Sequence, residues 1–397
     1  MTTYAPMRYC KRCTYPMVAV NLAMNENNEC SGCIVHDEKY QIDWPSREKE
    51  FQDIVEQYRN PDGKNYDCII PVSGGKDSHF QVWYIKKKLG LNPLLVSYYT
   101  HNYTETGDHN LENLSRAFGV DHYVFRPGLD VIRKMNLATF KKTGDMSWHF
   151  HCGVYTLAFQ VAVKHNIPLV IYGEHGFLDL AGQFSFDDRP EFTRLYRKQH
   201  ILRGYDWGDF LGLEGLTERE LLWAQYPTDE EIAKVGVRGI FMGVYVYWDG
   251  NKNAEEMQKW GFRPNPEAYV RTYRRSSNVD DIHENGIKDW LKFVKFGYGR
   301  CTDHTSKDIR LGAMTREKGV ELVSQYDHVV CEKSLAHFLN MTGMDREEFF
   351  RISDRFRDPR VWWIQNGEWW KDNLWGKPSS YEKVQLPEDE REKYIRE

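Results

Sequence analysis

Short apolar runs alternate with helical, amphipathic segments between residues 68 and 173. The runs are CIIPV (68–72), PLLVSYY (93–99), HYVFR (122–126) and PLVIYG (168–173). The helical segments are 78–89, 111–118, 131–142 and 154–165. This alternation predicts an α/β fold with a doubly wound parallel sheet. Ligands of such sheets bind at the carboxyl ends of the strands, so the end of the first run is the expected site.

The pattern changes on both sides of this core. A charged amphipathic helix is predicted over 46–59, and the pattern loosens beyond residue 190, with helices expected at 191–202 and 217–226. GIFMGVYVYWDG (239–250) indicates a strand running into a turn, and 281–356 is helical and charged. We therefore predict three parts: a module over 1–45, a core over 46–235, and a mainly helical, substrate-binding and capping region over 236–397. VWWIQNGEWW and Trp375 are expected to form a cap or to contact another subunit.

Four of the eight cysteines lie in the first 33 residues, as two C-x2-C pairs: Cys10, Cys13, Cys30 and Cys33. Two such pairs supply four thiolates, the ligand set of a closed, structural Zn²⁺ site. A module this small has no core of its own, so the metal would supply its folding energy. The alternative, four unrelated reduced cysteines, is disfavoured by the spacing.

The sequence SGGKDS (73–78) stands directly between the first apolar run and the helix that follows. Glycines let a backbone approach an anion, and a helix N-terminus offers free N–H groups. The loop is too short for the G-x4-G-K-[ST] pattern. It resembles instead the pyrophosphate loop (PP-loop) of ATP pyrophosphatases, which adenylate a carbonyl or amide oxygen and release pyrophosphate.

Each loop residue has an expected role in binding ATP. Lys76 would neutralise phosphates, and Asp77 would hold Mg²⁺. Hydrogen bonds to the phosphates are expected from Ser73, Gly74, Gly75 and Ser78. The resemblance also implies an adenine site at the end of the second run, at Ser97, where relatives bind adenine through backbone groups. Glu174, after the fourth run, is predicted to orient a metal or an amine nucleophile, with a solvated loop carboxylate as the alternative.

The stretch KFGYGRCTDHTSKDIRLGAMTREKGVELVSQYD (295–327) is dense in arginine, aspartate, threonine and histidine. Its arginines, Arg300, Arg310 and Arg316, are predicted to bind an anionic substrate, although a charged helix surface explains the spacing equally well. This stretch, the paired C-x2-C, SGGKDS and GVYVYWD (243–249) together resemble the N-acetyl sugar amidotransferase family, which includes WbpG-like and PseA-like proteins. The resemblance covers residues 8 to about 350.

The resemblance implies an ATP-dependent C–N ligase that converts an acetamido group of a sugar to an acetamidino group. The sugars would be nucleotide-linked uronates or nonulosonate precursors for bacterial surface polysaccharide, such as O-antigen, or flagellin. Asp303 and His304 are expected near the reacting nitrogen. The sequence shows no G-x-C-x-G elbow and starts Met1-Thr2. Ammonia is therefore expected from a separate glutaminase subunit, relayed by a cyclase-like (β/α)8 barrel subunit.

A second activity is weighed against this one. Thiolating PP-loop enzymes use cysteines near the third and fourth strands, where Cys152 lies, and Cys301 offers a second thiol. Cys152 has no C-x2-C companion, and reduced, inert cysteines are the simpler interpretation. A zinc-bearing scaffold without activity is disfavoured by the intact SGGKDS.

Net charge and hydropathy bear on the ligands and the cellular location of the protein. The net charge of −5 and the pI of about 6.3 disfavour binding of nucleic acid by bulk charge. The sequence has no apolar run long enough for a membrane span and starts without a signal-peptide pattern. We therefore expect a cytoplasmic protein that uses ATP, Mg²⁺ and Zn²⁺ and does not contact a membrane.

Overall fold

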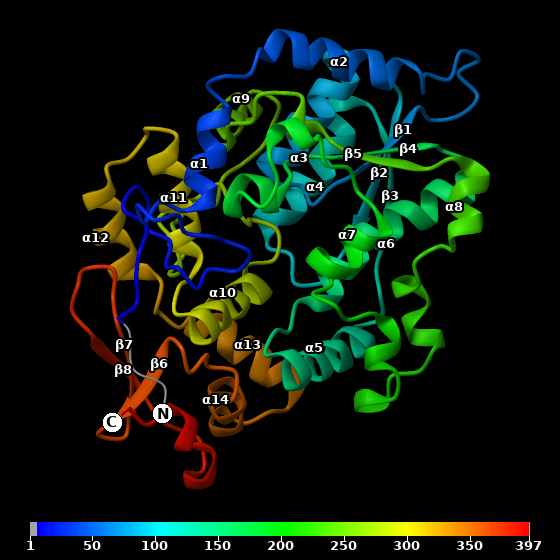
Figure 1. Ribbon diagram of the computed structural model, residues 1–397. Helices are drawn as coiled ribbons and strands as arrows, with labels where there is room; N and C mark the ends of the chain where they lie inside the picture. Colours follow the sequence, from blue (N-terminus) through cyan, green and yellow to red (C-terminus); the bar gives the residue numbers. More distant parts are fainter. Residues whose placement is uncertain (1–5, 397) are drawn as a thin grey trace.

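The computed structural model describes residues 6–396, and its elements are labelled in Figure 1. The helices are α1 (Ser31–Glu38), α2 (Trp44–Glu56), α3 (Lys76–Trp83), α4 (Glu105–Phe118), α5 (Leu129–Thr143), α6 (Trp148–His165), α7 (Arg194–Tyr196), α8 (Asp229–Val235), α9 (Gly250–Gln258), α10 (Ile282–Phe296), α11 (Arg300–Arg310), α12 (Arg316–Tyr326), α13 (Glu332–Thr342) and α14 (Arg346–Asp354). The strands are β1 (Cys68–Pro71), β2 (Pro93–Tyr98), β3 (Asp121–Phe125), β4 (Leu169–Tyr172), β5 (Arg238–Phe241), β6 (Trp362–Gln365), β7 (Glu368–Lys371) and β8 (Ser379–Lys383).

The core is a five-stranded parallel sheet with strand order β3-β2-β1-β4-β5. β1, β2 and β4 are buried along their whole length, which explains their unbroken apolar sequences. β3 is more exposed because it lies at an edge. The predicted α/β fold with a doubly wound parallel sheet is confirmed.

The order in which successive strands are added reverses at the centre of this sheet. From β1 the chain builds β2 and β3 outward on one side, and then β4 and β5 on the other. The carboxyl ends of β1 and β4 therefore meet at the switch point, where ligands of such folds bind. β5 lies beyond residue 235, so the sheet continues past the predicted end of the core.

Helices cover the sheet and bring distant segments to its edge. α6 packs on β1, β2 and β4, whereas α3 packs on β1 and contacts α4 and α9. α3 begins directly after the SGGKDS glycines, with Gly75 as its N-cap. The N-terminus of α3 is thereby fixed at the switch point.

The N-terminal segment folds around its four cysteines and packs on the C-terminal helices. Short bridges join Tyr9 to Pro16 and Met24 to Cys30. The Thr14 hydroxyl group lies 2.8 Å from the hydroxyl of Thr305, which belongs to α11. In Figure 1 this blue segment lies beside α11 and α12. The module is thus attached to the helices that carry the arginine-rich stretch.

The C-terminal region is helical from α10 to α14, as predicted, but it ends in a second sheet. β6, β7 and β8 form this antiparallel sheet, at the end of the molecule away from the core sheet (Figure 1). The prediction of a mainly helical region missed it, although Asn366-Gly367 between the two tryptophan pairs is a hairpin turn signal, and both residues have positive φ here. Trp362 and Trp369 are fully buried, with the Arg357 guanidinium 4.2 and 4.8 Å from their ring centroids.

Within residues 6–396, no helix has both the length and the apolar character that a membrane crossing requires.

Candidate active site and metal centre

The SGGKDS loop is held tightly at the end of β1. Gly74 has φ +88, and a Cβ added there would lie 2.8 Å from the backbone nitrogen of Leu111 in α4. The backbone N–H of Ser73 donates to Ser78 Oγ at 3.1 Å. At Gly75, by contrast, an added Cβ would meet only Ser73 Oγ, at 3.7 Å. One glycine allows the close packing, and the other leaves open space in front of α3.

That space belongs to a cavity of about 300 Å³. Its walls include the loop, the segment after β4, the start of α9, the loop 276–280 and one face of α11. Ten of the residues predicted for the site line it: Ser73, Gly75, Lys76, Asp77, Ser78, Glu174, Arg300, Asp303, His304 and Arg310. The cavity therefore gathers residues from the PP-loop and from the arginine-rich stretch.

Lys76 and Asp77 form an ion pair at the floor of the cavity. Lys76 is buried, and Asp77 Oδ1 is buried without a hydrogen-bond partner among residues 6–396. A Cβ at Gly250 would lie 3.5 Å from Lys76 Nζ and 3.9 Å from Asp77 Oδ1, so this glycine leaves room beside both groups. An unsatisfied carboxylate oxygen is the ligand that Mg²⁺ prefers, so Asp77 fits the predicted metal role.

Helix α11 forms the opposite wall. Arg300, Asp303, His304 and Lys307 follow at helical spacing, and this places them on one face. Arg300 pairs with Asp289 at 3.0 Å and with Asp303 at 3.1 Å. Burial would raise the pKa of Asp303, but Lys292 and Arg300 outweigh it and hold that pKa below its ordinary value. Asp303 is therefore a charged, firmly held carboxylate.

His304 is the neutral group of this wall. Its Nδ1 lies 2.6 Å from Thr272 Oγ1. Burial, together with Arg274 and other nearby cations, lowers the pKa of His304 well below its ordinary value. A neutral imidazole in a cavity can accept a proton, which a charged one cannot.

Glu174 is the more exposed end of a chain of ion pairs that runs inward through Lys307 and Asp179. Lys307 Nζ lies 2.9 Å from Glu174 Oε2 and 2.7 Å from Asp179 Oδ2. Lys39 completes the chain, 2.8 Å from Asp179 Oδ1. The alternative of a fully solvated loop carboxylate does not fit, because Glu174 is fixed by Lys307 and faces the cavity.

Sequence reasoning missed the pair of Arg274 and Asp308, which are 2.5 Å apart. Both residues are largely buried, Arg274 lines the cavity, and Asn251 Nδ2 donates to Asp308 Oδ1 at 2.8 Å. Asp308 lies inside the quoted stretch 295–327, but Arg274 sits in an irregular segment without a recognisable pattern. Nothing in the sequence alone pointed to Arg274.

Three predicted residues have other environments. Gly74 packs against α4 and does not line the cavity. The Ser97 hydroxyl is buried and donates to the Val72 carbonyl at 2.5 Å, with His122 Nε2 at 2.8 Å, so this side chain ties strands together. The expected adenine contact through backbone groups at this strand end stays a prediction. Arg316 donates to the Cys10 and Cys13 carbonyls at 3.1 and 3.2 Å. Arg316 thus holds the cysteine module, which corrects its predicted role in substrate binding.

Arg310 contacts the cysteine module and also lies at the cavity wall. Its Nη1 donates to the Asp179 and Leu180 carbonyls at 3.0 and 2.9 Å, and its Nη2 lies 3.4 Å from Cys30 Sγ. It also lines the cavity. Because these contacts occupy both terminal nitrogens, Arg310 links the cysteine module to the cavity wall and is not available as a simple anion clamp.

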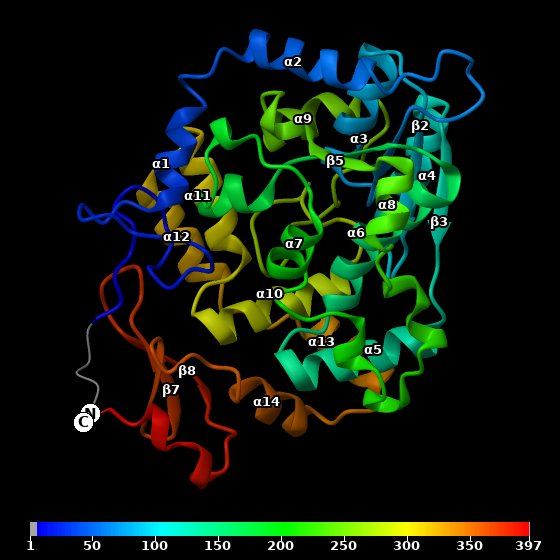
Figure 2. The same ribbon diagram turned by 45° about the vertical axis from the view of Figure 1, so that its right-hand side comes forward.

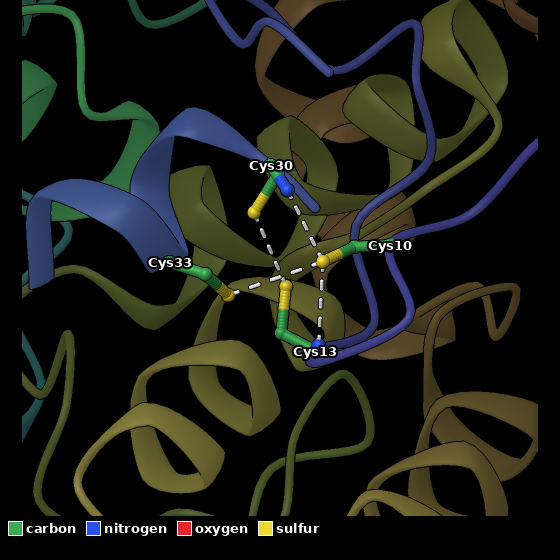
Figure 3. A group of neighbouring side chains, drawn as sticks. All are labelled: Cys10, Cys13, Cys30 and Cys33. Atoms are coloured by element: carbon green, nitrogen blue, oxygen red, sulfur yellow. Dashed lines mark hydrogen bonds between the residues drawn. The ribbon is translucent and has the colours of Figure 1, made fainter. Parts of the chain in front are cut away.

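The four predicted metal ligands converge (Figure 3). The Sγ atoms of Cys10, Cys13, Cys30 and Cys33 all lie within 4.8 Å of one another, and all four side chains are fully buried. Backbone N–H groups of Arg12, Cys13 and Cys30 approach Cys10 Sγ at 3.3 to 3.5 Å. Converging thiols with N–H donors and a neighbouring guanidinium suit a negatively charged Zn²⁺–thiolate centre. The cluster therefore fits the predicted structural zinc site.

The cysteines considered for thiolation lie elsewhere. Cys152 is fully buried beside Arg197 and lines none of the cavities described here. Burial raises the pKa of the Cys152 thiol to about 11 and also raises that of Cys301. Both thiols are protonated at neutral pH, which makes them poor nucleophiles.

The sheet order and the strand–SGGKDS–helix unit define an α/β protein with the arrangement predicted for a PP-loop. Residues 267–374 match the family model described as "LPS biosynthesis protein WbpG-like, C-terminal domain". The match covers less than half of the chain, and for these residues it confirms the resemblance noted in the sequence. The matched residues include Arg274, Arg300, Asp303 and His304 of the cavity wall.

Individual proteins resemble the chain less extensively. An uncharacterised protein of Methanocaldococcus jannaschii is 32% identical over 83 residues, which are 21% of this chain and 30% of that protein. The structure of NMN synthetase from Francisella tularensis aligns with a TM-score of 0.35 at 12% identity, over 76% of this chain and 94% of that one. NH3-dependent NAD synthetase from Campylobacter jejuni aligns with a TM-score of 0.28 at 15% identity, over 56% of this chain and 99% of that one. Both TM-scores are low, and neither neighbour's reaction carries over to this chain.

Proposed function

We propose that the protein is an ATP-dependent amidotransferase that converts an acetamido group of a sugar or sugar nucleotide to an acetamidino group. The product would serve bacterial surface-polysaccharide or flagellin-glycan biosynthesis. The observation that carries the proposal is one cavity lined both by the PP-loop and by the α11 face of the WbpG-like domain. The proposed ATP site and the α11 face that belongs to the family match therefore line the same cavity.

The reaction balances without a redox step. The acetamido oxygen attacks the α-phosphorus of ATP, and pyrophosphate leaves. Ammonia then adds to the activated carbon, AMP leaves with the former amide oxygen, and ammonia gives up a proton. Adenylation is needed because an amide oxygen is a poor leaving group.

The side chains of the cavity divide this work. Lys76 and the N-terminus of α3 bind the phosphates, and Asp77 would hold Mg²⁺, which neutralises phosphate charge when bound. Neutral His304 can accept a hydrogen bond from the attacking ammonia, so it is the group suited to orient this nucleophile. Arg300 and Arg274 supply positive charge near the adenylate, and the Lys307–Glu174 pair fixes the wall beside β4.

Ammonia would come from a partner glutaminase, with a cyclase-like (β/α)8 barrel subunit as the relay. The basis is the absence of a glutaminase elbow in the sequence. Ammonia must reach the adenylate unprotonated, and a docked partner that excludes water would serve that need.

The test supplies ammonium chloride in place of a partner. The zinc-loaded protein is incubated with ATP, Mg²⁺ and acidic acetamido sugars or their nucleotide conjugates. We expect AMP, pyrophosphate and a product in which NH replaces oxygen, resolved by mass spectrometry. Release of ADP, or no product with any such sugar, would contradict the proposal.

Substitutions in the PP-loop test whether the reaction takes place in the first cavity. Lys76→Ala and Asp77→Asn should each lower the rate of pyrophosphate release by roughly 100-fold or more without lowering the thermal unfolding temperature. Lys87→Ala, on the exposed side of the same helical segment, is the matched control. Cys152→Ser should retain full activity, and loss of activity in this folded variant would favour thiolation instead.

A further inference from the structure

A second cavity, of about 520 Å³, adjoins the first. The N-terminal module, α10, the turn Phe177–Ala181 and the segment 199–203 line it. Both ribbon views place the N-terminal loops, α10 and the region of α7 next to one another (Figure 1, Figure 2). Its volume lies within the range of small-molecule sites.

This second cavity carries an excess of positive charge. Five cationic side chains line it: Arg203, Lys288, Lys292, Lys295 and Arg300. The lining carboxylates are Asp145 and Asp303. Asp145 is already paired with Arg203, and Asp303 with Lys292 and Arg300. The remaining positive charge belongs to two lysines of α10.

Lys288 and Lys295 lack a carboxylate partner. Lys288 Nζ lies 3.0 Å from His151 Nε2, and Lys295 Nζ lies 3.3 Å from the Thr143 carbonyl oxygen. Within residues 6–396, neither ammonium group has a carboxylate oxygen within 4.0 Å. Burial lowers the pKa of each lysine to about 8. Both lysines are partly buried, and cations withdrawn from water are normally paired, so two of them without an ion-pair partner at a cavity wall point to a missing anion.

Aromatic rings give the same cavity a surface for a ring-shaped ligand. Phe177 and His200 have ring centroids 5.0 Å apart, and Phe296 and Tyr298 have theirs 6.3 Å apart. Sugars and bases pack on such rings, whereas a free inorganic anion gains nothing from them. The expected ligand therefore combines an anionic group with a ring.

The two cavities share part of their walls, because Leu180, Arg300 and Asp303 line both. We propose that the second cavity binds the anionic end of the acetamido sugar, a phosphate or a carboxylate, on Lys288 and Lys295. The acetamido end then points past Arg300 and Asp303 toward the PP-loop. This inference rests on the proposed function for the identity of the ligand, but the binding site itself does not.

Ammonia is the other occupant to consider, because a positively charged cavity disfavours ammonium and keeps ammonia neutral. A route for ammonia needs neither the aromatic rings nor a cavity of this volume. We therefore assign the second cavity to the anionic sugar, and the experiment below distinguishes this ligand from ammonia.

The test measures binding by calorimetry, and it measures the KM for ammonium separately in the ammonium-dependent assay given above. The probes are UDP-N-acetylglucosamine for the phosphate, N-acetylneuraminate for the carboxylate, and neutral N-acetylglucosamine. The Lys288→Met/Lys295→Met double variant is compared with the wild type and with Lys333→Met, an exposed lysine on α13. We expect the wild type to bind at least one acidic probe at least 10-fold more tightly than the double variant does. The affinity for a non-hydrolysable ATP analogue should stay unchanged, which also shows that the double variant is folded.

Three results would overturn the inference. They are no binding of either acidic probe by the wild type, equal affinity in the wild type and the double variant, and a raised KM for ammonium with sugar affinity unchanged. The last would assign the cavity to ammonia. If the acidic probes bind through the two lysines but no amidotransfer occurs with any sugar, the proposed function fails and the anion site stands.

Discussion

Gly74 and Gly75 are neighbours in the loop but serve different physical needs. Gly74 combines a left-handed φ with a close approach to α4, so any side chain there strains the backbone and clashes. Gly75 has an ordinary φ of −68 and open space beside it. Its missing side chain matters only when phosphate occupies that space.

This difference predicts opposite behaviour for two alanine variants. Gly74→Ala should lower stability by about 1–3 kcal/mol, through strain and the contact with Leu111. Gly75→Ala should leave the thermal unfolding temperature unchanged but raise the KM for ATP by roughly 10-fold or more. Thermal unfolding and pyrophosphate release measure the two effects. Equal loss of stability in both variants would contradict a phosphate role for the open side of Gly75.

At the residue scale, the sequence predicts whatever depends on local order. The loop Ser73 to Ser78 and the four cysteines were found because spacing along the chain determines their geometry. Lys288 and Lys295 carried no such signal, because they face a cavity only after α10 packs near the N-terminal module. Arg274 was missed for the same reason, since its partner Asp308 is 34 residues away.

At the scale of elements, α11 and α12 show what helical periodicity cannot decide. The dense charge of residues 295–327 predicted a functional face, and α11 supplies one to the first cavity. The partner of each arginine depends on how the helices pack, so Arg316 was assigned to substrate although it holds the cysteine module. Similarly, the helix predicted at 191–202 is only α7 followed by a π-helical turn at Arg197–Ile201, because buried Arg197 and the rings around Tyr196 anchor this segment.

The position of Arg316 predicts a defect in zinc retention. Arg316→Gln removes charge-assisted hydrogen bonds to the Cys10 and Cys13 carbonyls, a loss of about 1–2 kcal/mol for the module. Zinc should be released faster to a chelating dye, while the KM for the sugar stays within about 2-fold of wild type. Lys318→Gln, an exposed position on the same helix, is the control. A large rise in the sugar KM with normal zinc release would restore the substrate role.

At the scale of the whole molecule, three regions that are distant in sequence form one working unit. The core sheet supplies the PP-loop, the WbpG-like region supplies α10 and α11, and the cysteine module closes the second cavity with Tyr15 and Leu22. Loss of zinc would therefore reach beyond the first 45 residues, because the module borders the proposed sugar site. This arrangement concentrates partly buried positive charge where a ligand is expected, at a cost in stability.

That cost predicts that removing a cation stabilises the protein. Lys295 faces Asp145 and Arg203 as well as the Thr143 carbonyl, and burial still lowers its pKa to about 8 from an ordinary value of 10.5. Below pH 8 the folded and unfolded chains both carry the proton, so the folded state bears the full cost of burying the charge. Between pH 8 and 10.5 the folded chain releases the proton while the unfolded chain keeps it, so this cost shrinks as pH rises.

Lys295→Met should therefore raise the free energy of unfolding at pH 7 by about 1–3 kcal/mol while weakening binding of the acidic sugar. The gain should become smaller at pH 9.5, where the wild-type lysine is largely neutral in the folded state. Urea unfolding at the two pH values measures both effects, and Lys333→Met should change stability by less than about 0.5 kcal/mol. If Lys295→Met lowered the free energy of unfolding at both pH values, Lys295 would be a structural residue. A cation retained for ligand binding lowers stability, whereas one retained for packing raises stability.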